Sequence, residues 1–128
     1  MTPLPDPLRR FLDLYHDAEF WESHEALEDA WRETGSDFYQ GLILYASAWV
    51  HWERENAHGV RAQLGKALNR LEDYPDRYLG VDVADLRSRC EATRRIVAAH
   101  PEGWSALVRP EPLAVDPEAV AGDEPELG

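Results

Sequence analysis

Apolar side chains recur at helical spacing through most of the chain. In the first such stretch Leu8, Phe11, Leu12 and Tyr15 lie at positions i, i+3, i+4 and i+7, the pattern of a helix that buries one face. No segment shows the sustained alternation of apolar and polar residues, bounded by turn residues, that is typical of a β-strand. The pattern therefore predicts an all-α protein.

Local start and stop signals divide residues 1–109 into about five helices. The first helix begins at Asp6–Pro7, the second runs from about Ala18 to Glu33, and the third runs from Ser36–Asp37 to about Glu55. The fourth helix follows the turn Asn56–Gly59 and ends at Pro75, and the fifth follows Asp82 and ends at Pro101. The short connections between the middle helices predict a compact bundle of mostly antiparallel neighbours. We expect residues 1–109 to form a single helical domain.

Residues 110–128 differ from the rest of the chain in composition. They contain six acidic residues, several prolines and no basic residue. A segment with so few apolar side chains buries too little surface to offset the entropy lost on ordering. We therefore expect residues 110–128 to form an acidic C-terminal tail that is mobile or only loosely docked.

The amino-acid composition excludes some classes of binding partner. The chain of 128 residues has 25 acidic and 13 basic residues, a formal charge of −12, which argues against binding to nucleic acid or to an anionic membrane. Its longest strongly apolar run, Leu42 to Val50, is too short to cross a bilayer, and its N-terminus lacks the features of a signal peptide. We expect a cytoplasmic protein. The single cysteine, Cys90, excludes an internal disulfide framework and fits a core position.

The second predicted helix carries polar residues on the side that should be buried. At 100° per residue, His24 and Glu28 fall in the same stripe as Phe20 and Trp31, whereas the opposite side is acidic. A carboxylate in a dry environment needs an ion-pair, hydrogen-bond or metal partner. We therefore expect another helix to supply a partner for this pair.

The third predicted helix offers such a partner. It is apolar almost all round, yet Gln40, Ser47 and His51 project along one line, at positions i, i+7 and i+11. The simplest arrangement places this line against the polar side of the second helix. His24, Glu28 and His51 would then meet, with Ser47 and Gln40 nearby.

Several of these residues belong to motifs of a known family. The segment Phe20–Trp31 resembles the signature of the DUF309 family, a His-x3-Glu-x2-Trp motif. The segment Phe38–Ile43, with a histidine at position 51, resembles the second block of that family, and Asn56-x2-Gly59 resembles its following turn. The resemblance covers roughly residues 11–80 and implies an all-helical fold without an established activity.

The resemblance also implies candidate site residues. The family motif has been suggested to bind metal, which points to His24, Glu28 and Trp31, with His51 as a further candidate. One departure is Leu44, because many members of the family have glutamine there. No counterpart of the segment beyond Arg109 is known in the family.

The chemistry of these residues leaves three functional interpretations open. The sequence favours a structural or interaction module, in which a hydrogen-bonded network of His24, Glu28 and His51 specifies helix packing. The alternative is a metal-dependent enzyme of hydrolase type, in which the same three residues hold Zn, Fe or Mn and a bound water acts as nucleophile. A third is a sensor that binds a small molecule in the same cavity. In each case Phe20, Trp31, Gln40 and Ser47 line the site.

The tryptophans suggest an oligomer. Trp49 and Trp52 lie on a helix that is already apolar elsewhere, and a body of this size offers little cover for both. Uncovered aromatic side chains of this kind are common at subunit interfaces. We therefore expect a homodimer.

Overall fold

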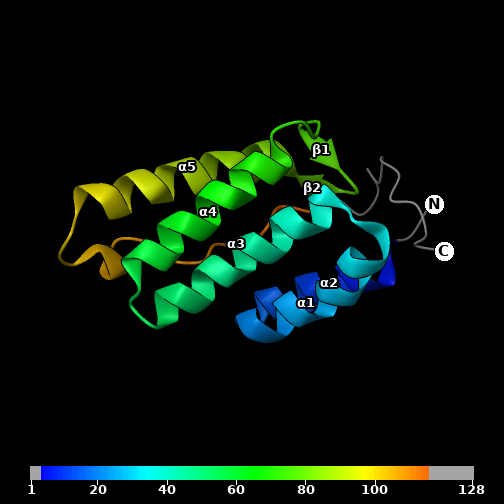
Figure 1. Ribbon diagram of the computed structural model, residues 1–128, viewed down its shortest axis with the longest axis horizontal. Helices are drawn as coiled ribbons and strands as arrows, with labels where there is room; N and C mark the ends of the chain where they lie inside the picture. Colours follow the sequence, from blue (N-terminus) through cyan, green and yellow to red (C-terminus); the bar gives the residue numbers. More distant parts are fainter. Residues whose placement is uncertain (1–3, 116–128) are drawn as a thin grey trace.

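The computed structural model describes residues 4–115, and these form a bundle of five helices (Figure 1). The elements are α1 (Asp6–His16), α2 (Phe20–Thr34), α3 (Asp37–Glu53), α4 (Ala57–Leu71), β1 (Arg77–Tyr78), β2 (Val81–Asp82), α5 (Val83–Ala99) and the 3-10 turn η1 (Trp104–Ala106). Each helix packs mainly on the next one along the chain, and tight connections make neighbours antiparallel. The predicted all-α bundle is confirmed.

The helix boundaries follow local signals. α1 has a proline in its first turn, and α2 ends at Gly35, whose φ of 68° is a left-handed conformation that favours glycine. α2 begins at Phe20, two residues later than predicted, because Ala18 itself adopts a left-handed φ of 62°. The Ser36 hydroxyl accepts a hydrogen bond from the Tyr39 backbone N–H and so caps α3.

α3 lies at the centre of the bundle, between α2 and α4 (Figure 1). Most of its side chains are buried, as expected for a helix that is apolar almost all round. At Gly41 the backbone comes so close to α4 that an added Cβ would lie 2.7 Å from the buried Leu71 side chain. The small residue therefore sets the close approach of α3 and α4.

The connection between α4 and α5 contains a short hairpin that the pattern did not predict. Its two strands have two residues each, with Tyr78 opposite Val81, and such a length shows no alternation in the sequence. The guanidinium of Arg87 donates hydrogen bonds to the backbone oxygens of Leu71 and Tyr74, and so ties the connection to α5. Asp82 caps α5 through the Asp85 backbone N–H, as predicted.

Residues 108–115, here called the C-terminal strap, pack against the bundle. Val108 and Leu113 are buried, and the Asp82 N–H donates to the Ala114 backbone oxygen. Figure 1 shows the strap passing behind α3. The first six residues of the segment predicted to be a tail thus contact the bundle, while residues 116–128 of that predicted tail lie outside the described residues.

Among the helices of the described residues, none has both the length and the apolar character needed to cross a membrane.

Candidate functional site

His24 and Glu28 lie at the edge of the buried side of α2, not within it. Their side chains are 22% and 27% exposed, so both reach solvent. The buried residues Phe20, Ser23, Leu27 and Ala30 define the inner direction of the helix, and at 100° per residue His24 lies roughly 80° away from it. The buried polar pair that the pattern predicted is therefore a half-exposed pair on the rim of the helix.

This rim carries a chain of side-chain contacts one turn apart. The Trp21 and His24 rings stack with centroids 5.2 Å apart, and His24 Nδ1 lies 3.9 Å from Glu28 Oε2. Arg32 in turn donates a short hydrogen bond to Glu28 Oε1. Glu28 therefore has a cationic partner on its own helix and needs none from α3.

At Ser47 and His51 the polar line of α3 contacts α4 rather than α2, which corrects the predicted arrangement. Ser47 Oγ accepts a hydrogen bond of 2.9 Å from Gln63 Nε2 of α4. His51 packs on the first turn of α4, where a Cβ added to Gly59 would lie 2.4 Å from its ring. The sequence of a helix that is apolar almost all round does not indicate which of its sides packs on which neighbouring helix. In this bundle the glycines Gly41 of α3 and Gly59 of α4 allow the close contact between these two helices.

His51 is held as a neutral hydrogen-bond acceptor. The Asn56 amide donates from Nδ2 to His51 Nδ1 over 3.1 Å, while Asn56 Oδ1 accepts from the Gly59 N–H and caps α4. Burial, and to a lesser extent the charge of Arg54, lowers the pKa of His51 below its usual value. Sequence reasoning missed Asn56 and Gln63 as partners, although Asn56 was recognised as part of a turn.

The predicted ligand set does not assemble into a metal centre. Across residues 4–115, no three His, Cys, Asp or Glu side chains are grouped so that they could hold a metal ion. His51 therefore does not join His24 and Glu28, and the two residues on α2 alone do not make the three-ligand arrangement of a catalytic metal site. The residues present do not fit the suggested metal.

The remaining predicted lining residues separate in the same way. Gln40 is half-buried on the same side of α3 as Ser47, and Trp31 is half-buried on the rim of α2. Phe20, by contrast, is buried and lines a different cavity. The seven residues grouped by the pattern thus occupy three separate environments.

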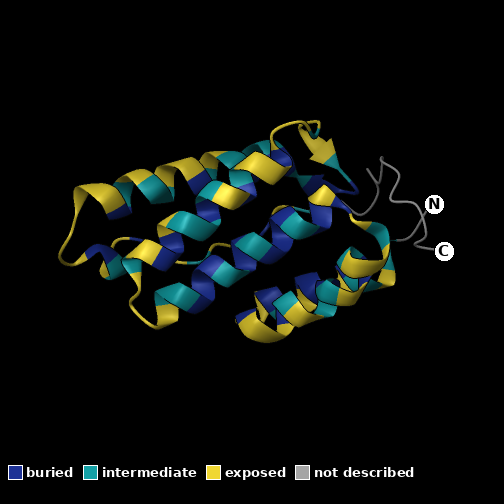
Figure 2. Ribbon diagram, in the orientation of Figure 1, coloured by how far each residue is buried: buried dark blue, intermediate teal, exposed yellow. Residues whose placement is uncertain are grey.

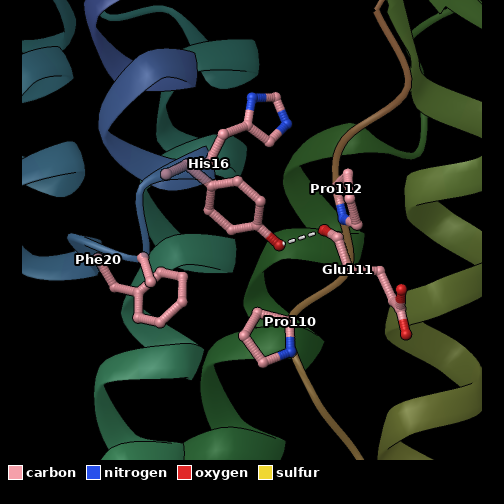
Figure 3. A pocket seen from close by; sticks show the side chains of 7 residues that line it. His16, Phe20, Pro110, Glu111 and Pro112 are labelled. Atoms are coloured by element: carbon pink, nitrogen blue, oxygen red, sulfur yellow. Dashed lines mark hydrogen bonds between the residues drawn. The ribbon is translucent and has the colours of Figure 1, made fainter.

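The cavity at Phe20 lies between the corner of α1 and α2 and the C-terminal strap, and has a volume of about 110 Å³ (Figure 3). It is lined by Tyr15, His16, Ala18, Phe20, Pro110, Glu111 and Pro112. The Tyr15 hydroxyl donates to the Glu111 backbone oxygen over 2.7 Å, and His16 Nε2 accepts from the Leu113 N–H. These polar atoms are occupied in holding the strap, which sequence reasoning could not find because it treated the strap as a tail.

The buried nucleophilic groups are held in unreactive forms. Burial raises the pKa of the Cys90 thiol to about 12, so the thiol stays protonated at neutral pH. Burial, together with the contact with Tyr45, raises the pKa of the Tyr15 hydroxyl. Burial also raises the pKa of the Tyr45 hydroxyl. Cys90 therefore acts as a small core residue.

Taken together, fold and side chains define a small α-helical protein with a half-exposed polar rim. Residues 8–63 match the family DUF309, described as a domain of unknown function. This segment is a DUF309 domain, which confirms the resemblance drawn from its motifs. The match covers α1, α2, α3 and the first half of α4, a shorter span than residues 11–80 at its C-terminal end. No curated protein matches the chain.

Proposed function

We propose that this protein is an interaction module that works as a homodimer, with the open side of α3 at its interface. The proposal rests on one observation. Gln40, Leu44, Ser47 and His51, here called the α3 face, are half-buried and uncharged at neutral pH. Figure 2 shows α3 between α2 and α4, with buried and half-buried residues along most of its length.

The surroundings of the α3 face support an interface. Trp31 is half-buried on the rim of α2, and Trp21, at 53% exposed, is one of the two large apolar side chains that are exposed among the described residues. Tryptophan is enriched at the centres of protein interfaces, and charged residues are depleted there. The rim of His24, Glu28 and Arg32 would then form the polar border of the interface.

We propose that the partner is a second copy of the chain. The dimer would form in the cytoplasm and would need no further component. The test is sedimentation equilibrium at micromolar concentration, for which we expect the mass of a dimer. Leu44→Glu would place a charge at the centre of the α3 face and should give a monomer. The matched control is Leu107→Glu, at an exposed position on the 3-10 turn, which should remain a dimer. A monomeric wild-type chain would overturn the proposal.

The metal-dependent hydrolase is not favoured, because the described residues supply no ligand group for it. Elemental analysis of protein purified without chelator or nickel resin tests this point separately. Stoichiometric Zn, Fe or Mn that disappears in His24→Ala would show that the rim of α2 binds metal and would reverse this preference.

A further inference from the structure

The two helices that border the α3 face carry opposite charge. α2 contains five acidic residues and one arginine, whereas α4 contains three basic residues, Arg61, Lys66 and Arg70, and no acidic one. The two helices lie on opposite sides of α3 (Figure 1). The α3 face therefore lies between a helix with a net charge of −4, here called the acidic edge, and a helix with a net charge of +3, here called the basic edge. Glu28 is the acidic residue on the rim of α2, and the other acidic residues of that helix lie on its outer side.

The basic edge can be placed along α4 from its contacts with α3. Gln63 lies at the height of Ser47, to which it is hydrogen-bonded, and Leu71 lies at the height of Gly41. Lys66 and Arg70 follow Gln63 by three and seven residues, so they project from the same side of α4 within about 60°. Both are exposed, and Arg70 Nη1 lies 3.1 Å from Asp37 Oδ1 of α3. The exposed cations of α4 therefore stand beside the α3 face.

The acidic edge lies at matching heights along α2. The tight turn at Gly35 and Ser36 makes α2 and α3 antiparallel, so with equal rise per residue Glu28 stands roughly level with Ile43 and Trp31 roughly level with Gln40. By the same measure Lys66 is roughly level with Leu44, and Arg70 with Gln40. Glu28 and Lys66 thus flank one part of the α3 face, and Trp31 and Arg70 flank another.

From this charge separation we infer that two copies pack through their α3 faces about a two-fold axis parallel to α3. This inference rests on the homodimer proposed above and specifies its geometry. Rotation about that axis places α2 of each subunit on α4 of the other, acidic on basic, and keeps residues of equal height together. The other in-plane two-fold axis, perpendicular to α3, would place α2 on α2 and α4 on α4. Like charges in contact disfavour that arrangement.

The inferred geometry pairs particular side chains. Glu28 of each subunit meets Lys66 of the partner subunit, and Trp31 meets Arg70 of the partner subunit, where a guanidinium over an indole ring is favourable. Each contact occurs twice because the interface is isologous. A polyanion such as nucleic acid would contact the carboxylates of α2 together with the cations of α4, so the mixed edge fits a second copy better.

A charge exchange between subunits tests the axis. In Glu28→Lys both paired contacts become Lys against Lys, and in Lys66→Glu both become Glu against Glu. Each variant alone should dimerise more weakly by roughly tenfold or more. When the two variants are mixed in equal amounts, both contacts in the mixed dimer are again of opposite charge, so the mixed dimer should regain most of the affinity. Sedimentation equilibrium at low salt measures the affinities, and native mass spectrometry identifies the mixed dimer.

Controls separate this result from changes in folding or in net charge. Glu91→Lys and Arg95→Glu make the same charge changes at exposed positions of α5, which does not border the α3 face, and should leave the dimer affinity unchanged. Thermal melts of all variants verify that they fold. A dimer that resists both single charge reversals, or a mixture without recovery, would overturn the inferred axis while the homodimer stands. A monomeric wild-type chain would overturn both.

Discussion

At the scale of single residues, Asn56 joins two helices through one amide group. Its oxygen accepts the Gly59 N–H at the start of α4, and its nitrogen donates to His51 at the end of α3. The sequence predicted a turn here because asparagine commonly caps helices. The bond to His51 could not be predicted, because it depends on the angle between α3 and α4 and not on any local pattern.

Asn56→Ala removes both bonds and should lower the free energy of unfolding by about 1–2 kcal/mol, because the first turn of α4 loses its cap and His51 loses its donor. Urea denaturation followed by circular dichroism measures this loss. Asn69→Ala is the matched control, since Asn69 is an exposed residue in the last turn of the same helix, away from the cap. It should change stability by no more than about 0.5 kcal/mol. Equal losses in the two variants would contradict the role of Asn56.

At the scale of the elements, the helices were predictable because their signals are local. Pro7, Ser36, Asp82 and Gly35 act within one turn of the helix that they start or end. The neighbours of α3 were not predictable, because apolar residues surround it and leave several packing arrangements open. The candidate site was misassigned for this reason. The pattern identified the polar line of α3 but gave no information on which helix it faces.

Gly41 is the residue that fixes the approach of α4 to α3. Gly41→Ala would put a Cβ 2.7 Å from Leu71, which is fully buried. We expect a loss of about 1–2 kcal/mol, after the gain in helix propensity is included. Gly65→Ala is the matched control on α4. The nearest atoms to its Cβ would be those of the flexible Arg94 guanidinium, at 3.3 Å, so it should be neutral or slightly stabilising. Chemical denaturation of both variants measures whether the close contact with Leu71 or the gain in helix propensity has the larger effect on the free energy of unfolding.

At the scale of the whole molecule, the C-terminal strap links the two ends of the described chain. Tyr15 and His16, at the end of α1, bond to the backbone of Glu111 and Leu113, nearly 100 positions later. Arg89 of α5 donates to the Pro112 oxygen. The composition of residues 110–128 did not indicate these contacts, because an average over an acidic, proline-rich segment gives little weight to a single apolar residue such as Leu113.

Leu113 is 5% exposed and is the side chain by which the strap enters the core. Leu113→Ala should lower the free energy of unfolding by about 2 kcal/mol, the smaller end of the range for buried leucines, because a strap can shift to fill part of the space. Leu107→Ala is the matched control, because the same atoms are removed from a side chain that is 53% exposed, and it should cost no more than about 0.5 kcal/mol.

Hydrogen exchange shows in addition which part of the molecule is loosened by Leu113→Ala. If the strap holds the corner of α1 and α2 in place, Leu113→Ala should increase the exchange rate of the Ala18 amide, which donates to the Tyr15 oxygen at that corner, more than that of amides in the middle of α3. Equal stability losses in the two leucine variants would mean that the strap lies on the bundle without supporting it.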